Sequence, residues 1–144
     1  MPRDSVMPNA PIDTNVILRY LVEDPKTIAP RFKGVYSFFE KIESGQLVVH
    51  LAELVLFQTY FVLTSFYKVP RPVAAAKLGE LLAFRGIRIP EKEIALACLK
   101  RLETENLDIV DAYLLEWVEI KGAPGVYSFD SDLDTKAVPL LPVQ

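Results

Sequence analysis

Residues 10–21 read APIDTNVILRYL, a short apolar stretch that ends at Asp13 and passes directly into a helical pattern. The apolar residues 10–12 predict a strand. Asn15 is a favourable N-cap, and the apolar residues that follow it predict a helix that ends before Asp24-Pro25. A strand that runs directly into a helix is the repeating unit of an α/β fold.

The same alternation continues along the rest of the chain. Further strands are expected at 47–49, 126–129 and 137–141, a connector or short strand at 86–90, and helices at 27–44, 51–67, 73–84, 91–105 and 110–120. This order predicts an α/β fold with a mostly parallel central sheet and helices on both faces.

The composition fits one globular domain. The chain has 144 residues, of which 51% are hydrophobic and 24% charged, so it can bury one core but not two. Residues 1–9 are expected to form a disordered tail and residues 10–144 a single domain. Cys98 is the single cysteine, which excludes an intramolecular disulfide and indicates a reducing, cytoplasmic compartment.

Two stretches of unusual charge bear on possible partners. Residues 44–67 carry few charges, but His50 and Glu53 interrupt them, so they are expected as a buried strand and a core helix and not as a membrane span. Residues 65–101 hold eight basic and three acidic residues within a chain of net charge -3. An acidic body with one basic segment can hold metal ions at one place and phosphates at another, although a mixed solvated surface explains most of these basic residues equally well.

Carboxylates follow the predicted strands. Asp13 and Asp130 come directly after two of them, and Glu53 lies in the first turn of the helix after a third. Because the carboxyl ends of parallel strands meet at one edge of a sheet, we expect these three to lie close together. Asp111, in the first turn of helix 110–120, is expected to point at the same edge, with Asp108 as the N-cap of that helix.

Some of the acidic residues also have a simpler structural interpretation. Glu53 alone would equally fit a solvent-facing residue at a helix N-terminus, and Asp132 and Asp134 are expected to be solvent-facing residues of a turn. Four carboxylates gathered at one place would instead repel one another unless divalent cations neutralised them. Oxygen ligands favour Mg²⁺ or Mn²⁺, which activate water for attack on a phosphodiester. His50, the single histidine, is expected to be structural.

Four segments of the chain resemble, in order and spacing, the PIN-domain ribonucleases, and within them the VapC toxins of toxin-antitoxin pairs. The segments are 12–21 (IDTNVILRYL), 51–54 (LAEL), 108–112 (DIVDA) and 128–130 (SFD). The resemblance begins at about Ala10 and covers nearly all of the chain. It implies a three-layer α/β/α fold.

The resemblance also implies a function and a site. Asp13, Glu53, Asp111 and Asp130 would be the acidic quartet that binds Mg²⁺ or Mn²⁺ and catalyses cleavage, with Asn15 and Ser128 as polar supports. The protein would be a metal-dependent endoribonuclease, usually a homodimer, silenced by a VapB-like antitoxin. Charge alone suggests RNA contacts at Arg19, Lys68, Arg71 and Lys77.

Two other functions stay open at this stage. The first is a PIN domain without activity that binds protein or RNA, although retention of four acids argues against it. The second is a phosphatase of the haloacid dehalogenase type with Asp13 as nucleophile, although Asn15 stands where that class has a second aspartate.

Overall fold

The structure is a computed structural model that describes residues 9–134 and 138–144. Its elements are, in chain order, α1 (Thr14–Val22), the 3₁₀ turn η2 (Pro30–Phe32), α2 (Gly34–Ser44), β1 (Val49–His50), α3 (Glu53–Ser65), α4 (Arg71–Leu82), β2 (Ile87–Arg88), α5 (Lys92–Thr104), α6 (Ile109–Lys121), β3 (Val126–Tyr127), α7 (Ser131–Asp134) and β4 (Leu140–Leu141). The predicted tail, residues 1–9, lies outside the described residues except for Asn9.

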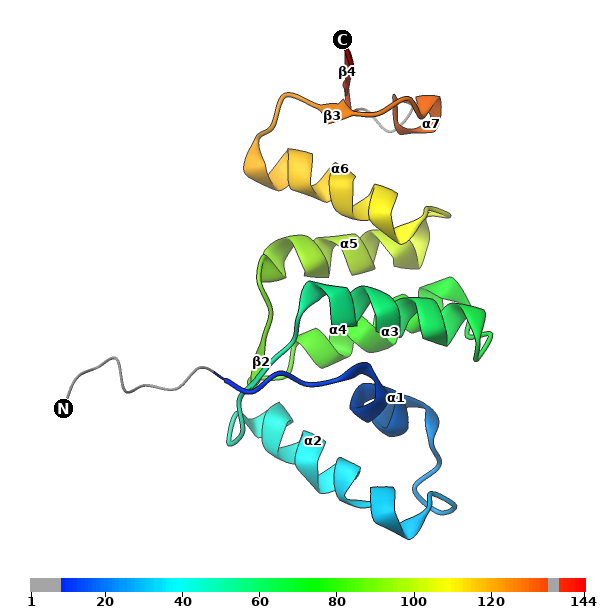
Figure 1. The fold of residues 1–144 in the computed structure, drawn as a ribbon, viewed down its shortest axis with the longest axis vertical. Helices are drawn as coiled ribbons and strands as arrows, with labels where there is room; N and C mark the ends of the chain where they lie inside the picture. Colours follow the sequence, from blue (N-terminus) through cyan, green and yellow to red (C-terminus); the bar gives the residue numbers. More distant parts are fainter. Residues whose placement is uncertain (1–8, 135–137) are drawn as a thin grey trace, which may run out of the picture.

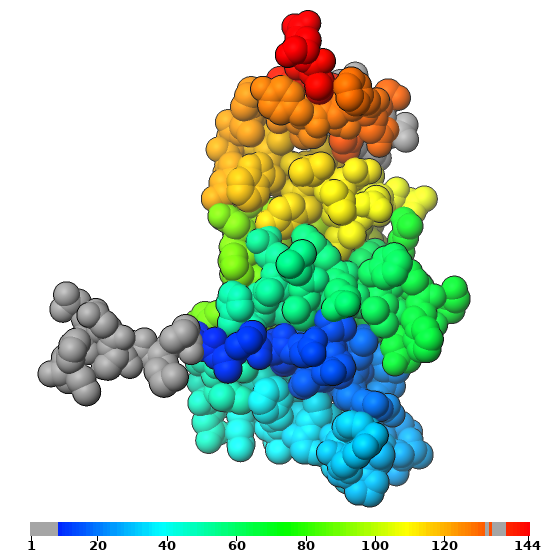
Figure 2. Space-filling view, in the orientation of Figure 1, coloured from blue at the N-terminus to red at the C-terminus, as the bar shows by residue number. Residues whose placement is uncertain are grey.

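The helices are stacked along the long axis of the molecule. Figure 1 shows α2 at one end, followed by α1, then α3 and α4, then α5, then α6. Helix α5 packs against both α4 and α6, and α1 packs against both α2 and α3. The C-terminal elements β3, α7 and β4 lie beyond α6, at the end opposite α2, and the space-filling view shows the same order on the surface (Figure 2).

The strands are short and parallel. Val49 of β1 pairs with Ile87 of β2, and Pro11 forms a parallel bridge to His50 on the other side of β1. The Ile12 amide donates to the His50 carbonyl at 3.0 Å, so the predicted strand at residues 10–12 is present as a bridged segment. Strands β3 and β4 pair in parallel with each other, and within the described residues they form a second sheet apart from the first.

Two predicted helix starts are wrong. The helix expected at 27–44 begins at Gly34, because Pro30 lacks an amide proton and keeps Ala29 out of the helical conformation. The N-cap of α1 is Asp13 and not Asn15. Asp13 has extended backbone angles and its carboxylate accepts a hydrogen bond from the Thr14 amide at 2.7 Å.

Other helix ends follow the sequence signals. Asp108 caps α6 by accepting a hydrogen bond from the Val110 amide at 2.8 Å, as predicted. Gly45 ends α2 and Gly122 ends α6, both in the left-handed conformation that glycine adopts at low cost. Residues 131–134 form the one-turn helix α7 where a turn was expected.

One apolar core holds the stack together. Fully buried side chains come from all of the long helices, among them Ile17, Ile42, Leu56, Leu78, Leu99 and Leu115. Burial of a side chain of this size is worth about 1.5–3 kcal/mol. Within the described residues, each helix is too short or too polar to cross a bilayer.

Candidate functional site

Asp13 and Glu53 stand at the same edge of the first sheet. The bridged segment that ends at Asp13 runs parallel to β1, and β1 leads directly into α3, which begins at Glu53. The hydroxyl of Thr14 donates to the Gln58 side chain of α3 at 2.8 Å, which fixes the start of α1 against α3. Asp13 is exposed and Glu53 is half-buried. The backbone therefore places these two acids at one edge of the sheet, as the sequence analysis expected.

Glu53 has a partner that the sequence analysis missed. The Tyr113 hydroxyl, from α6, donates a hydrogen bond to the Glu53 carboxylate. The Tyr113 ring packs edge-on against Phe57 of α3, with ring centroids 5.4 Å apart. Burial, the hydrogen bond and the negative charge of Glu53 raise the pKa of Tyr113 well above its ordinary value. The phenol therefore remains a proton donor to Glu53 at neutral pH.

Asp111 lies in the first turn of α6, two residues before Tyr113, and is half-buried. Since Tyr113 contacts the first turn of α3, the N-terminal half of α6 faces Glu53. Residues two apart on a helix do not share a face, so the contact of Tyr113 does not by itself place the Asp111 carboxylate beside Glu53.

Asp130 is located elsewhere in the molecule. It follows β3, which Figure 1 shows on the far side of α6 from α1 and β1. The Ser128 hydroxyl accepts a hydrogen bond from the Asp130 amide at 2.9 Å, and this contact shapes the turn after β3. The structure does not bring Asp130 next to Asp13, because β3 pairs with β4 and not with the segment before Asp13.

Within the part of the chain that the structure describes, the predicted acidic quartet is not seen as one cluster. Among the residues that the structure describes, no three acidic, histidine or cysteine side chains are positioned to hold one metal ion. Asp13 and Glu53 lie at one sheet edge, and Asp130 lies at the end of the molecule formed by β3 and α7. The described residues therefore do not show the four acids at one place, and the divalent-ion site stays a prediction.

Comparison with protein families shows to which family the chain is related. A family model described as PIN domain matches residues 11–139. The chain belongs to the PIN domain family. PIN domains have a three-layer α/β/α fold, so the fold class predicted from the sequence is confirmed. They are generally nucleases that act on RNA and use divalent metal ions. Comparisons with curated proteins and with solved structures gave no match.

The basic residues proposed to contact RNA in this PIN domain lie on α1, on α4 and in the loop before α4. Arg19, in α1, forms an ion pair with Glu23 at 2.7 Å. Arg71, at the start of α4, donates to Asn106 at 3.2 Å. Lys77 lines a hollow beside Tyr20, and Lys68 is an exposed residue in the left-handed conformation. Arg71 thus stabilises the loop before α6 by its hydrogen bond to Asn106.

Asn15 lines a pocket between α1 and α2 instead of capping α1. Arg31 and Phe32 line the same pocket, and the sequence analysis named neither as a functional residue. The sequence signal near this pocket is Pro30, which breaks the expected helix and begins the 3₁₀ turn that carries Arg31 and Phe32 in this PIN domain. Tyr113 carried no comparable signal, because its position in a helical pattern is equally typical of a core residue.

Proposed function

We propose that the protein is an endoribonuclease of the VapC type that hydrolyses RNA phosphodiester bonds and requires Mg²⁺ or Mn²⁺. Asp13, Glu53, Asp111 and Asp130 are its catalytic acids. Asn15 and Ser128 support them. The observation that carries the proposal is the PIN domain match, which spans residues 11–139 and includes all four acids.

The backbone at the first sheet adds support. Asp13 and Glu53 follow two neighbouring parallel segments, and ligands of parallel sheets bind outside the carboxyl ends of the strands. Tyr113 holds the Glu53 carboxylate by a hydrogen bond and so orients it. A phosphatase of the haloacid dehalogenase type has no such support and is not proposed.

The proposal is tested by incubating total cellular RNA with the purified protein in Mg²⁺ or Mn²⁺. We expect discrete fragments, and no fragments in EDTA. The variant Asp13→Asn, which keeps a side chain able to cap α1, is expected to abolish cleavage with the melting temperature unchanged.

A matched control separates catalysis from general effects of charge. Asp24 is also an exposed aspartate whose carboxylate accepts a backbone hydrogen bond, from Lys26 at 2.9 Å, but it lies outside the quartet. Asp24→Asn is therefore expected to cleave RNA as the wild type does. Loss of activity in both variants would contradict a specific role for Asp13.

The separation of Asp130 from Asp13 favours one other candidate, a PIN domain that binds RNA or protein without cleaving. Its signature would be no cleavage under any metal condition and no shift of the melting temperature on addition of Mn²⁺. A ligand at one hundred times its Kd stabilises the fold by about 2.7 kcal/mol, so a metal site of useful affinity would be detected.

The toxin assignment also implies a homodimer and a VapB-like antitoxin. Large apolar side chains on the surface of α3 and just beyond it support an interface. Phe61 is 66% and Phe66 74% exposed, and exposed apolar side chains that form one patch mark interaction surfaces. Light scattering of the wild type and of Phe61→Ser with Phe66→Ser tests this, with a dimer expected for the first and a monomer for the second.

A further inference from the structure

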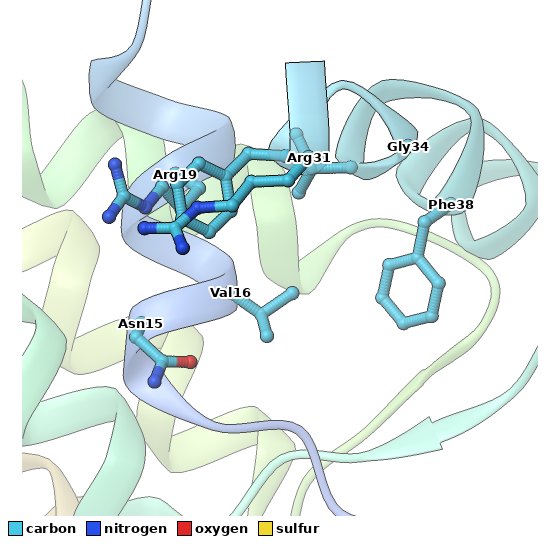
Figure 3. Close-up of a pocket in the computed structure, with 8 residues that line it drawn as sticks. Asn15, Val16, Arg19, Arg31, Gly34 and Phe38 are labelled. Atoms are coloured by element: carbon cyan, nitrogen blue, oxygen red, sulfur yellow. The ribbon is translucent and has the colours of Figure 1, made fainter. Parts of the chain in front are cut away.

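A pocket of about 610 Å³ opens between α1 and the segment that joins it to α2. Its lining residues are Asn15, Val16, Arg19, Arg31, Phe32, Gly34, Val35 and Phe38. Figure 3 shows the guanidinium groups of Arg19 and Arg31 at one end, the Phe38 ring at the other and Val16 between them. The pocket therefore has a cationic end and an apolar end.

Both arginines are held by the same aromatic ring. The guanidinium carbon of Arg19 lies 3.8 Å from the centroid of Phe32, and that of Arg31 lies 4.5 Å from it. Stacking on an aromatic ring fixes the plane of a guanidinium group and leaves its N–H groups free to bind an anion. Phe32 thus orients two cationic groups at one site.

The charge at this end is only partly balanced. Glu23 pairs with Arg19, whereas Arg31 makes no ion pair with any of the described residues. Two positive charges on one ring repel each other, and an anion placed between them relieves the repulsion. The pocket is thus suited to a ligand that carries a negative group and an apolar, planar group.

We propose that this pocket binds one nucleotide of single-stranded RNA, with the phosphate on Arg31 and Arg19 and the base against Val16, Val35 and Phe38. The inference rests on the proposed function, because it assigns part of the substrate to the pocket. Unstacked RNA bases bind on aromatic rings and arginine planes, and their phosphates bind guanidinium groups.

The position of the pocket supports this occupant over a protein segment. Asn15 lines the pocket and follows Asp13 by two residues, so the pocket adjoins the end of α1 at which Asp13 is the N-cap. A neutral or basic peptide would leave the charge of Arg31 unbalanced. The volume, about 610 Å³, lies within the range of small-molecule sites.

The test is fluorescence anisotropy of a short fluorescein-labelled single-stranded RNA of mixed sequence, measured in EDTA so that the RNA remains intact. We expect Arg31→Ala and Phe32→Leu each to weaken binding about tenfold, the effect of losing one stacked or phosphate-bound group. Arg31→Lys, which keeps the charge but not the plane, is expected to weaken it less than Arg31→Ala. Lys100→Ala removes one exposed positive charge from α5, outside the pocket, and is the matched control.

The salt dependence of binding separates a phosphate contact from a structural effect. Each phosphate contact to single-stranded RNA contributes about -0.7 to the slope of log affinity against log salt, so Arg31→Ala is expected to reduce the slope by about that amount. Phe32→Leu removes no charge, so it is expected to reduce the salt slope less than Arg31→Ala does. A folding defect would lower affinity without this pattern.

The outcomes distinguish the inference from the proposed function. Binding that depends on Arg31, in a protein that cleaves no RNA, would support the inference and overturn the proposed activity. If the wild type cleaves RNA, and Arg31→Ala binds RNA with the same affinity and the same salt dependence as the wild type, the inference is overturned and the proposed activity stands. Equal RNA binding by all variants would assign the pocket to another kind of ligand.

Discussion

Glu53 illustrates how a single residue connects distant segments of the chain. Its carboxylate, at the start of α3, accepts the hydroxyl of Tyr113 from α6, and the Tyr113 ring lies against Phe57. Hydrogen bonds to charged groups are worth about 1.5–3 kcal/mol, less where the acceptor is partly solvated as Glu53 is. The bond therefore links the element that carries Glu53 to the one that carries Asp111.

Replacing Tyr113 by phenylalanine tests that link. We expect Tyr113→Phe to lower the free energy of unfolding by about 1–2 kcal/mol, because the half-buried carboxylate loses its donor while the ring packing is kept. Urea unfolding followed by circular dichroism measures this. The control is Tyr36→Phe, whose hydroxyl donates to the Glu23 carbonyl at 3.3 Å and is expected to be worth less than about 0.5 kcal/mol. Equal stability of both variants would contradict the link.

Cys98 gives a prediction about pH. Burial, followed by the nearby Glu116, raises the pKa of its thiol to about 12, and Arg101 offsets part of this rise. The folded protein therefore keeps the thiol proton in a range of pH where the unfolded chain, with an ordinary pKa of 9.0, releases it. The free energy of unfolding is expected to fall as pH rises from about 9 toward 12, because the unfolded state binds fewer protons there.

Comparison with Cys98→Ala isolates this contribution from the titration of lysines and tyrosines. The difference in stability between wild type and variant should be constant below pH 9.0 and shrink above it. In the folded wild type, iodoacetamide should leave Cys98 unmodified at pH 8, where the unfolded chain reacts. Rapid modification of the folded protein would show that the thiol is not buried.

Helix caps show which residue roles can be predicted from sequence. Asp108 was predicted correctly because it directly precedes the apolar helical pattern, whereas Asn106 lies two residues further from it. At the start of α1, Asp13 and Asn15 are both good caps, and the choice depends on which residue has an extended backbone. The strand pairing at residues 10–12 extends the backbone as far as Asp13, and a local sequence pattern does not contain that information.

At the scale of elements, two glycines on neighbouring segments have opposite roles. A Cβ at Gly86 would overlap the Leu47 carbonyl oxygen and lie 2.8 Å from that of Ile42, so this glycine permits the close approach of β2 to the end of α2. Gly79 lies within α4, where a Cβ would meet none of the described residues within 4 Å. Replacement by alanine is therefore expected to lower the free energy of unfolding at Gly86 and to raise it at Gly79.

We predict that Gly86→Ala lowers the free energy of unfolding by about 3 kcal/mol or more, because backbone atoms cannot move aside easily. Gly79→Ala is expected to raise it by about 0.5–1 kcal/mol, since alanine is the better helix former. Thermal melts of both variants against the wild type measure the two shifts. A mild effect of Gly86→Ala would contradict the close packing of β2 on α2.

Most elements could be predicted from apolar periodicity, and the failures have local causes. Residues 27–33 keep an amphipathic pattern, yet Pro30 prevents a continuous helix there. The helix α7 is too short to have a periodicity of its own. A strand of two residues forms because of the segments that pair with it and not because of its own sequence. The prediction for residues 86–90 was therefore either a connector or a short strand.

At the scale of the whole molecule, the sequence predicted parallel strands and the α/β class but not the division into two sheets. The segment at 10–12, β1 and β3 each end at or near an acid, and a single parallel sheet would bring those acids to one edge. Which strands become neighbours depends on contacts far apart in the chain, here the packing of β3 and β4 beyond α6. The family could thus be predicted from its motifs, whereas the placement of Asp130 could not.

This separation gives a prediction about coupling across the molecule. The α1–α2 pocket and the β3–α7 segment lie at opposite ends of the stack (Figures 1 and 2), so substitutions at the two ends should act independently. Asp130→Asn is expected to lower kcat while RNA affinity in EDTA stays that of the wild type. Arg31→Ala is expected to lower affinity with little change in kcat.

The double variant decides whether the two ends stay apart during cleavage. If they do, the losses in kcat/KM of Asp130→Asn and Arg31→Ala add on a logarithmic scale, within about 0.5 kcal/mol. A larger coupling would mean that the C-terminal segment approaches the α1–α2 pocket when RNA is bound, because residues that do not interact show no coupling. Such a result would bring the segment that carries Asp130 toward the end of the molecule that carries Asp13, as a reaction served by all four acids requires.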